Sequence, residues 1–409
     1  MYYNYYRLLL LSIAALLIGC SKSDVSQNER SSYSYSMDGS HHIPNIGVPS
    51  SSYALQLPLK NICTSAPVAL NGFDSETYIV AQGKNIIIGS KQSNRIFATT
   101  TDSTAIVELL SDSDAIYAIH LNGSLDCYNL DGKINWHTTL NTIPKQGALL
   151  TKATIIISTD SAIRCIYSKD GTIKWTYHSS LVPQSICLDA EQQSIYLALS
   201  SNDAQGTDSI VCLTINGEVT ARYGFPKTRI TSNITSLKNG KISFGYLSGN
   251  ENSSLKKTPH IALWAVMNTS APKLVWDHTL NYLVTSVSTN GNLILSGGFR
   301  ENGGELVSGI DAFNIEDTTK LWQRRFSYPL VAMITVSNNH AYIPFTFTTQ
   351  ASVPTKTIVS MINLNDGTTI SELPVTTAES GFVQGVGTPA SGMLLYADKN
   401  TNRIYFLKP

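Results

Sequence analysis

The chain has 409 residues, and its 29 basic and 29 acidic side chains cancel to a formal net charge of zero. Charged residues make up only 14% of the chain and hydrophobic residues 42%. This balance excludes a disordered chain and argues against a nucleic-acid partner bound through a broad basic surface.

The chain begins with a segment typical of an export signal. Residues 1–7 are polar and contain one cationic side chain, Arg7. Residues 8–18 are an apolar run that is too short to span a bilayer comfortably. We therefore expect residues 1–19 to be a signal peptide.

The apolar run ends in Leu17-Ile18-Gly19-Cys20, which resembles the lipobox of bacterial lipoproteins. The resemblance implies cleavage before Cys20 and lipidation of Cys20 with palmitate-like acyl chains. Two or three such chains suffice for stable membrane anchoring. Ser21 follows, and by resemblance to enterobacterial sorting it implies the outer membrane. We expect the periplasmic face rather than the cell surface, although the orientation stays open.

The next segment is rich in Ser, Asn, Gln and charged residues. Such a composition buries too little apolar surface to fold by itself. We interpret residues 20–55 as the lipidated Cys followed by a flexible Ser-rich tether, and residues 56–409 as the globular part.

A turn signature recurs along the globular part. Asp131-Gly132 precedes Trp136, Asp170-Gly171 precedes Trp175, and Asp317 precedes Trp322, each Trp lying at the same offset from the turn's Asp. Trp276 follows a longer turn. Asp-Gly supplies the positive φ that tight hairpins need, so each Trp is predicted on the outgoing strand, covering the sheet of the preceding blade.

Short apolar strands also recur, at intervals close to the roughly 40 to 50 residues of propeller blades. Their first residues are Ile86, Ile116, Ile155, Ile195, Ile242, Leu293, Ala341 and Leu394. The sequence therefore predicts an all-β chain that forms an eight-bladed β-propeller. Seven blades is the alternative, because Ile86 and Ile116 are close together. We expect residues 403–406 to be a third strand, with residues 53–57 pairing outside it to close the ring.

From about residue 75 to the end, the pattern resembles the PQQ-like repeat, in which a strand leads through Ala-Leu-Asp and Gly to Trp. Cys127, Cys212, Ala312 and Met361 occupy the Ala position of that repeat. The resemblance implies a quinoprotein-type β-propeller. Quinoprotein dehydrogenases share this fold with non-catalytic lipoproteins such as BamB of the outer-membrane β-barrel assembly machinery.

Residues typical of the enzymes are not found in the sequence. It contains no adjacent Cys pair, no Cys-x-x-Cys-His haem motif and no acidic group that matches a quinoprotein Ca²⁺ site. His137, His178 and His278 lie near three of the Trp residues at differing offsets, which does not favour a metal ring. We expect no catalytic residues, cofactor, metal or small-molecule substrate.

Five cysteines follow Cys20, namely Cys63, Cys127, Cys165, Cys187 and Cys212. We interpret them as core thiols, with a Cys63–Cys187 disulfide left open.

The connection between the second and third strands of a repeat grows in four later repeats. It is short at residues 121–123 but is predicted as a solvated loop at residues 200–209, 247–259, 297–306 and 345–356. Insertions on one face of a repeat fold often mark its binding side. We therefore expect a non-catalytic, lipid-anchored scaffold that binds an envelope protein, with outer-membrane protein assembly as the role that the resemblance implies. A quinone-dependent dehydrogenase-like enzyme and a surface-exposed adhesin or secretion-system accessory remain alternatives.

Overall fold

The computed structural model describes residues 42–43, 51–59, 64–65, 68–70, 77–90, 92–189, 193–201, 207–249, 257–266, 272–302, 305–317, 319–328, 330, 334–337, 339–350, 353–374, 383–387, 394–398 and 403–408. All regular elements in these residues are β-strands. The alternation of Val, Ile, Tyr and Thr with polar residues between Gly and Asn turns is the pattern from which strands form. The expectation of an all-β chain is confirmed.

The first half of the described chain forms four sheets, each of four consecutive antiparallel strands. Their strands are β3 (Val68–Ala69), β4 (Tyr78–Gln82), β5 (Asn85–Gly89) and β6 (Asn94–Thr99); β7 (Ile106–Ser111), β8 (Ala115–His120), β9 (Ser124–Asn129) and β10 (Ile134–Thr139); β11 (Pro144–Leu150), β12 (Thr154–Thr159), β13 (Ala162–Tyr167) and β14 (Ile173–His178); and β15 (Val182–Leu188), β16 (Ser194–Ser200), β17 (Asp208–Thr214) and β18 (Val219–Phe225).

The second half adds three sheets on the same plan, two of them with an extra strand. Their strands are β19 (Thr228–Ile230), β20 (Thr235–Leu237), β21 (Lys241–Ser248), β22 (Thr258–Ala265) and β23 (Lys273–Thr279); β24 (Leu283–Thr289), β25 (Leu293–Asn302), β26 (Glu305–Asn314) and β27 (Lys320–Phe326); and β28 (Thr335–Ser337), β29 (His340–Gln350), β30 (Val353–Asn363) and β31 (Thr369–Pro374), beside which β1 (His42–Ile43) lies parallel to β28.

The last sheet joins the two ends of the described chain. It contains β32 (Val383–Gly387), β33 (Leu394–Asp398), β34 (Arg403–Lys408) and β2 (Ser51–Gln56). β2 pairs antiparallel with β34 from Ser51↔Lys408 to Gln56↔Arg403, which confirms the predicted closure. β2 begins at Ser51, so the last residues of the predicted tether (20–55) lie in this sheet. Pairing the ends protects strand edges that would otherwise be exposed.

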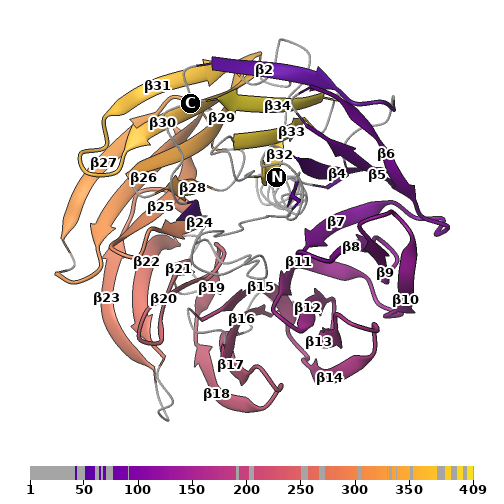
Figure 1. Cartoon of the computed structure of the whole chain (residues 1–409). Coiled ribbons are helices and arrows are strands. Elements are labelled where there is room, and N and C mark those ends of the chain that lie inside the picture. The colour runs from indigo at the N-terminus through magenta and orange to yellow at the C-terminus, as the bar shows by residue number, and fades with distance from the viewer. Residues whose placement is uncertain are drawn as a thin grey trace.

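The sheets follow one another around a ring, with β2 beside β34 where the indigo and yellow ends of the chain meet (Figure 1). The first strand of one sheet contacts the first strand of the next at β7 and β11 and again at β11 and β15, and β3 contacts β32 across the closure. The chain is therefore an all-β protein with the β-propeller fold.

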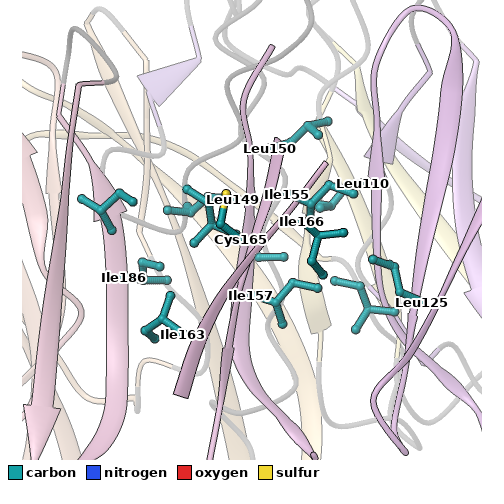
Figure 2. Packing of buried hydrophobic residues seen from close by; sticks show 14 of the residues in the cluster. Leu110, Leu125, Leu149, Leu150, Ile155, Ile157, Ile163, Cys165, Ile166 and Ile186 are labelled. Carbon is teal, nitrogen blue, oxygen red and sulfur yellow. The ribbon is translucent and has the colours of Figure 1, made fainter. Parts of the chain in front are cut away.

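Aliphatic side chains fill the space between successive sheets. In the largest such cluster, Leu110 and Leu125 of one sheet lie on the side of Ile157 and Ile166 of the next, and Leu149 lies on the opposite side of that second sheet, towards Ile186 of a third (Figure 2). Burying side chains of this kind contributes about 1.5–3 kcal/mol each, so these contacts stabilise the ring.

The cysteines occupy this core as expected. Cys127, Cys165 and Cys212 are buried free thiols. They lie at one register position, opposite Trp136, Trp175 and Ala221 respectively. Cys187 is also buried, and Cys63, its suggested disulfide partner, lies outside the described residues.

Three of the repeated Trp residues join one sheet to a turn of the next. The indole N–H of Trp136 donates to the Ser168 carbonyl at 3.0 Å, that of Trp175 to Ile215 at 3.1 Å, and that of Trp322 to Leu364 at 2.7 Å. These contacts confirm that the three Trp residues are structural. The prediction that each covers the preceding sheet was wrong, because each indole docks on the C-terminal turn of the following sheet.

A glycine in each receiving turn makes room for the ring. Gly171 has φ +73°, and a Cβ built on it would lie 2.5 Å from Trp136 Cε3. Gly217 and Gly367 stand in the same relation to Trp175 and Trp322. No side chain larger than hydrogen fits this position without displacing the indole.

Trp276 differs from the other three. It is buried and packs on Phe313 with ring centroids 5.5 Å apart, yet among the described residues its indole N–H has no hydrogen-bond partner. By spacing, the glycine position of the turn it faces is Thr318, which lies outside the described residues. The lost hydrogen bond thus coincides with loss of the turn glycine.

Candidate functional site

The two faces of the ring carry different connections. Because neighbouring strands are antiparallel, the connections between second and third strands and the links between sheets share one face. The contacts agree, since Leu121 N donates to Ala105 O at 2.9 Å and Leu140 N donates to Gly123 O at 2.9 Å. We call this the upper face. The lower face carries the Asp-Gly turns, such as Asp131-Gly132.

The hairpins of the upper face lengthen around the ring. Pairing ends at Ile119↔Leu125 in β8–β9 and at Ser158↔Ile163 in β12–β13. It continues to Ser248↔Thr258 in β21–β22, Asn302↔Glu305 in β25–β26 and Gln350↔Val353 in β29–β30. These three long hairpins of the described chain therefore lie in consecutive sheets and extend from the upper face. We call β21–β22, β25–β26 and β29–β30 together the hairpin wall.

This arrangement corrects two predicted loops. Residues 297–306 and 345–356 are largely paired strand, with only residues 303–304 and 351–352 at the tips outside the described part. Their Ser, Gly and Thr content indicated solvated loops, but strand pairing continues through both segments, and Thr and Val have high strand propensity. Of the predicted loops 200–209 and 247–259, residues 202–206 and 250–256 lie outside the described residues.

A buried carboxylate organises the upper face at the β7–β10 sheet. Asp126 accepts hydrogen bonds from His120 Nε2 at 3.0 Å, Thr100 Oγ1 at 2.7 Å, His137 Nδ1 at 2.6 Å and Tyr128 Oη at 3.1 Å. Burial alone would raise the pKa of Asp126, but the hydrogen bonds from His120, Thr100 and His137 outweigh it and hold the pKa well below its usual range. The cluster ties the β6–β7 link to three strands.

Two further buried carboxylates do the same elsewhere. Asp208 accepts from Ser201 N at 2.9 Å, Ile230 N at 2.8 Å and Arg229 Nη1 at 3.2 Å, which joins β19 and the end of β16 to β17. Asp311 occupies the position that Asp126 has in its own sheet and lies 3.4 Å from Arg325 Nη1. The cationic partners of Asp311, Arg325 and Lys320, lie on the neighbouring strand β27, and those of Asp208 include residues of β19, so both carboxylates hold adjacent strands together.

The polar residues of the described chain do not converge on a metal. No group of three or more His, Cys, Asp and Glu side chains within the described ranges is placed to hold an ion. His137 is engaged with Asp126, His178 is exposed on β14, and His278 stacks on Phe313 at 4.9 Å in another sheet. The three histidines therefore stand apart.

The predicted lipidation site, Cys20, lies outside the described residues, so its acylation stays a prediction. In the part of the chain that the structure describes, no helix has the length and apolar character needed to cross a bilayer.

Sequence reasoning missed the carboxylate clusters. A signal was present, because Asp126 and Asp311 each precede the small core residue of the repeat, Cys127 and Ala312. Strand alternation places such a residue on the opposite side of the sheet from the core residue, where it needs partners if it is buried.

Comparison with known proteins supports the fold and leaves the activity open. No family model matches the chain, and no curated protein matches its sequence. BamB from Moraxella catarrhalis is similar in structure, with a TM-score of 0.59 and 13% identity over 88% of this chain and 99% of that chain. Quinohemoprotein alcohol dehydrogenase from Comamonas testosteroni gives a TM-score of 0.62 and 10% identity over 97% of this chain and 84% of that chain.

The computationally designed protein Ika8 is also similar, with a TM-score of 0.62 and 11% identity over 86% of this chain and 98% of that chain. At these identities the likeness shows the fold alone. The neighbours include an alcohol dehydrogenase as well as BamB, so the fold does not decide between a catalytic and a non-catalytic role.

Proposed function

We propose that this protein is a lipid-anchored, eight-bladed β-propeller scaffold that binds an envelope protein through its upper face. In this proposal each of the eight sheets formed by the described residues is one blade. The observation that carries it is the wall of long hairpins, β21–β22, β25–β26 and β29–β30, in three consecutive sheets. Extended hairpins cost closure entropy and expose polar strand, and confinement to one sector is typical of a recognition surface.

The proposed location is the outer membrane. The leader and Cys20 support a lipid anchor, and Ser21 supports sorting to the outer membrane. The structural likeness to BamB suggests a partner in outer-membrane β-barrel assembly. The scaffold role requires no catalysis.

The experiment is co-purification of the full-length protein from detergent-solubilised membranes. The expected result is stoichiometric capture of a β-barrel assembly protein by wild type. Loss of capture on trimming the hairpin tips, with the anchor intact, would assign the binding to the upper face. Capture of no envelope protein would contradict the scaffold role, and dye-linked alcohol oxidation on addition of quinone and Ca²⁺ would favour the dehydrogenase alternative.

Anchoring is tested separately with Cys20→Ala. The variant should remain an unprocessed or mis-sorted precursor and should no longer incorporate a labelled fatty acid. Undiminished fatty-acid labelling of this variant would refute the proposed anchor.

A further inference from the structure

The lengthened hairpin β21–β22 carries a hydrogen-bonded row of three side chains. Ser248 Oγ lies 2.8 Å from His260 Nε2, and His260 Nδ1 lies 3.1 Å from Asp277 Oδ2. Ser248 is on β21, His260 on β22 and Asp277 on β23. A hydroxyl, an imidazole and a carboxylate in this order are the parts of a nucleophilic triad.

Strand register explains why the three side chains meet. His260 pairs with Tyr246 on β21 and with Thr279 on β23. Cross-strand partners share a face of a sheet, and so do residues two apart, which brings Ser248 and Asp277 to the face of His260. Ser248 and His260 belong to the pairs that the shorter hairpins of the ring lack.

The hydrogen bonds fix the proton positions. An ionised Asp277 only accepts, so the proton of a neutral His260 ring must sit on Nδ1. Nε2 is then an acceptor, and the Ser248 hydroxyl must donate to it. This is the tautomer in which His260 can take a proton from the hydroxyl.

Tyr246 holds this geometry. Its ring stacks on His260 with centroids 4.8 Å apart and planes 8° from parallel. Its hydroxyl donates to Asp277 Oδ2 at 2.8 Å. The imidazole is thus oriented by two neighbours, while the His260 and Asp277 side chains remain 14% and 27% exposed to solvent.

Cationic side chains line a small pocket beside Ser248. Ser248 lines a pocket of about 10 Å³ together with Lys227, Arg229 and Lys257. Arg229 is engaged with Asp208, whereas Lys257 is exposed beside the pocket. A space of this volume holds about one water-sized group, so only the reacting end of a substrate enters. The positive charge favours an anionic substrate and a developing oxyanion.

We propose that Ser248, His260 and Asp277 form a hydrolytic site for small esters that carry a negative charge, an activity beyond the proposed scaffold role. Ser248 Oγ bonds to the ester carbonyl carbon as its proton passes to His260 Nε2. The ester C–O bond then breaks, and His260 returns the proton to the leaving alcohol. Water attacks the acyl-serine with His260 as base, and the carboxylic acid leaves as Ser248 regains its proton. Asp277 is a positioning residue.

The first test is labelling of the full-length protein with a fluorophosphonate, in which a Ser Oγ–P bond forms and fluoride leaves. The expected result is a single adduct on Ser248, abolished in Ser248→Ala and in His260→Ala. The matched control is Ser180→Ala, at an exposed serine in the link between β14 and β15, which should label like wild type. Absence of labelling in wild type, or unchanged labelling in Ser248→Ala with an unchanged thermal transition, would overturn the proposal.

Hydrolysis of 4-nitrophenyl succinate and 4-nitrophenyl acetate gives a second readout. Asp277→Asn should lower kcat about 100-fold or more with little change in KM, and Asp277→Glu should recover part of it. Lys257→Ala should raise KM for the succinate ester and leave the acetate ester unaffected. Equal kcat in Asp277→Asn and wild type would remove Asp277 from the site. Failure of these tests leaves partner capture by the hairpin wall intact.

Discussion

The lower and upper faces of the ring follow different rules. On the lower face, Gly171, Gly217 and Gly367 each receive a Trp ring in one repeated geometry. On the upper face, the hairpins differ, from pairing that stops at Ile119↔Leu125 to pairing that reaches Asn302↔Glu305. In repeat folds the interface between neighbours supplies much of the stability. Because the lower face repeats the same stabilising contact from sheet to sheet, the upper-face connections are free to vary. Stability should therefore depend on lower-face contacts and function on upper-face additions.

Removal of a docked Trp should give the largest effect. Trp322 is buried and hydrogen-bonded to Leu364 O. Trp322→Ala should lower the free energy of unfolding by about 3–5 kcal/mol, because it empties a space between two sheets. Urea unfolding measures the loss, and a value within a few tenths of wild type would refute the assignment of stability to this face.

Asp126 and its hydrogen-bond partners test whether buried polar contacts of the upper face also contribute to the free energy of unfolding. Asp126→Asn should cost about 2–3 kcal/mol at pH 7, because His120, His137, Thr100 and Tyr128 lose a charged acceptor. The folded pKa of Asp126 is depressed, so its stabilisation is present above about pH 4 and is lost as the pH falls below that value. The difference between variant and wild type should shrink in unfolding experiments towards pH 3. A constant difference from pH 7 to pH 3 would contradict the charged role.

Two glycines, Gly171 and Gly291, allow the destabilisation caused by a clash with Trp136 to be separated from that caused by backbone strain. Gly171→Ala should cost about 2–3 kcal/mol, because a Cβ there would meet Trp136 and φ is +73°. Gly291 has φ +90° with nothing within 4 Å of a Cβ, so Gly291→Ala should cost only about 1 kcal/mol. Equal losses in the two variants would mean that Trp136 does not require a glycine.

Trp276 offers a smaller, sharper contrast within the lower face. Trp322→Phe removes a hydrogen bond to Leu364 O, whereas Trp276→Phe removes an indole N–H that has no partner in the part of the chain that the structure describes. We expect Trp322→Phe to be about 1 kcal/mol more destabilising than Trp276→Phe. The reverse order in thermal unfolding would show that docking contributes through packing alone.

The buried thiols of Cys127 and Cys212 should not react with a thiol reagent while the protein is folded. Burial raises the pKa of both Cys127 and Cys212 to about 12. Because the thiolate is the reactive form, the folded protein should not release colour from Ellman's reagent through these thiols at pH 8, and denaturant should expose them. Single Cys→Ala variants assign the signal, and rapid native-state labelling of either thiol would place it outside the core.

The lower face was the more predictable from sequence. Asp-Gly turns and Trp residues mark hairpins whose spacing is fixed by the repeat, and the Cys127 and Cys212 positions followed from that register. The closing pair β2–β34 was also predicted, because pairing residues 53–57 with residues 403–406 removes exposed strand edges.

The upper face was less predictable for physical reasons. Hairpin extension in residues 297–306 depends on long-range pairing of polar residues, for which composition indicates a loop. The meeting of Ser248, His260 and Asp277 depends on cross-strand register, in which a shift of one residue would turn His260 to the other side of the sheet. On the lower face, the turn that receives Trp276 shows a similar limit, since Thr318 at its glycine position gave no sign that, within the described residues, the indole N–H would be unpaired.

The most direct test of the central claim is partner capture by a protein with shortened hairpins. Residues 300–307 and 347–356 are each replaced by Asn-Gly, which favours the tight turns of two-residue hairpins. Asn122→Ala in the short β8–β9 connection is the control. We predict that the trimmed protein keeps a near-native thermal transition and loses the envelope partner that wild type and control retain. Capture at wild-type yield by the trimmed protein would contradict the assignment of binding to the β25–β26 and β29–β30 hairpins.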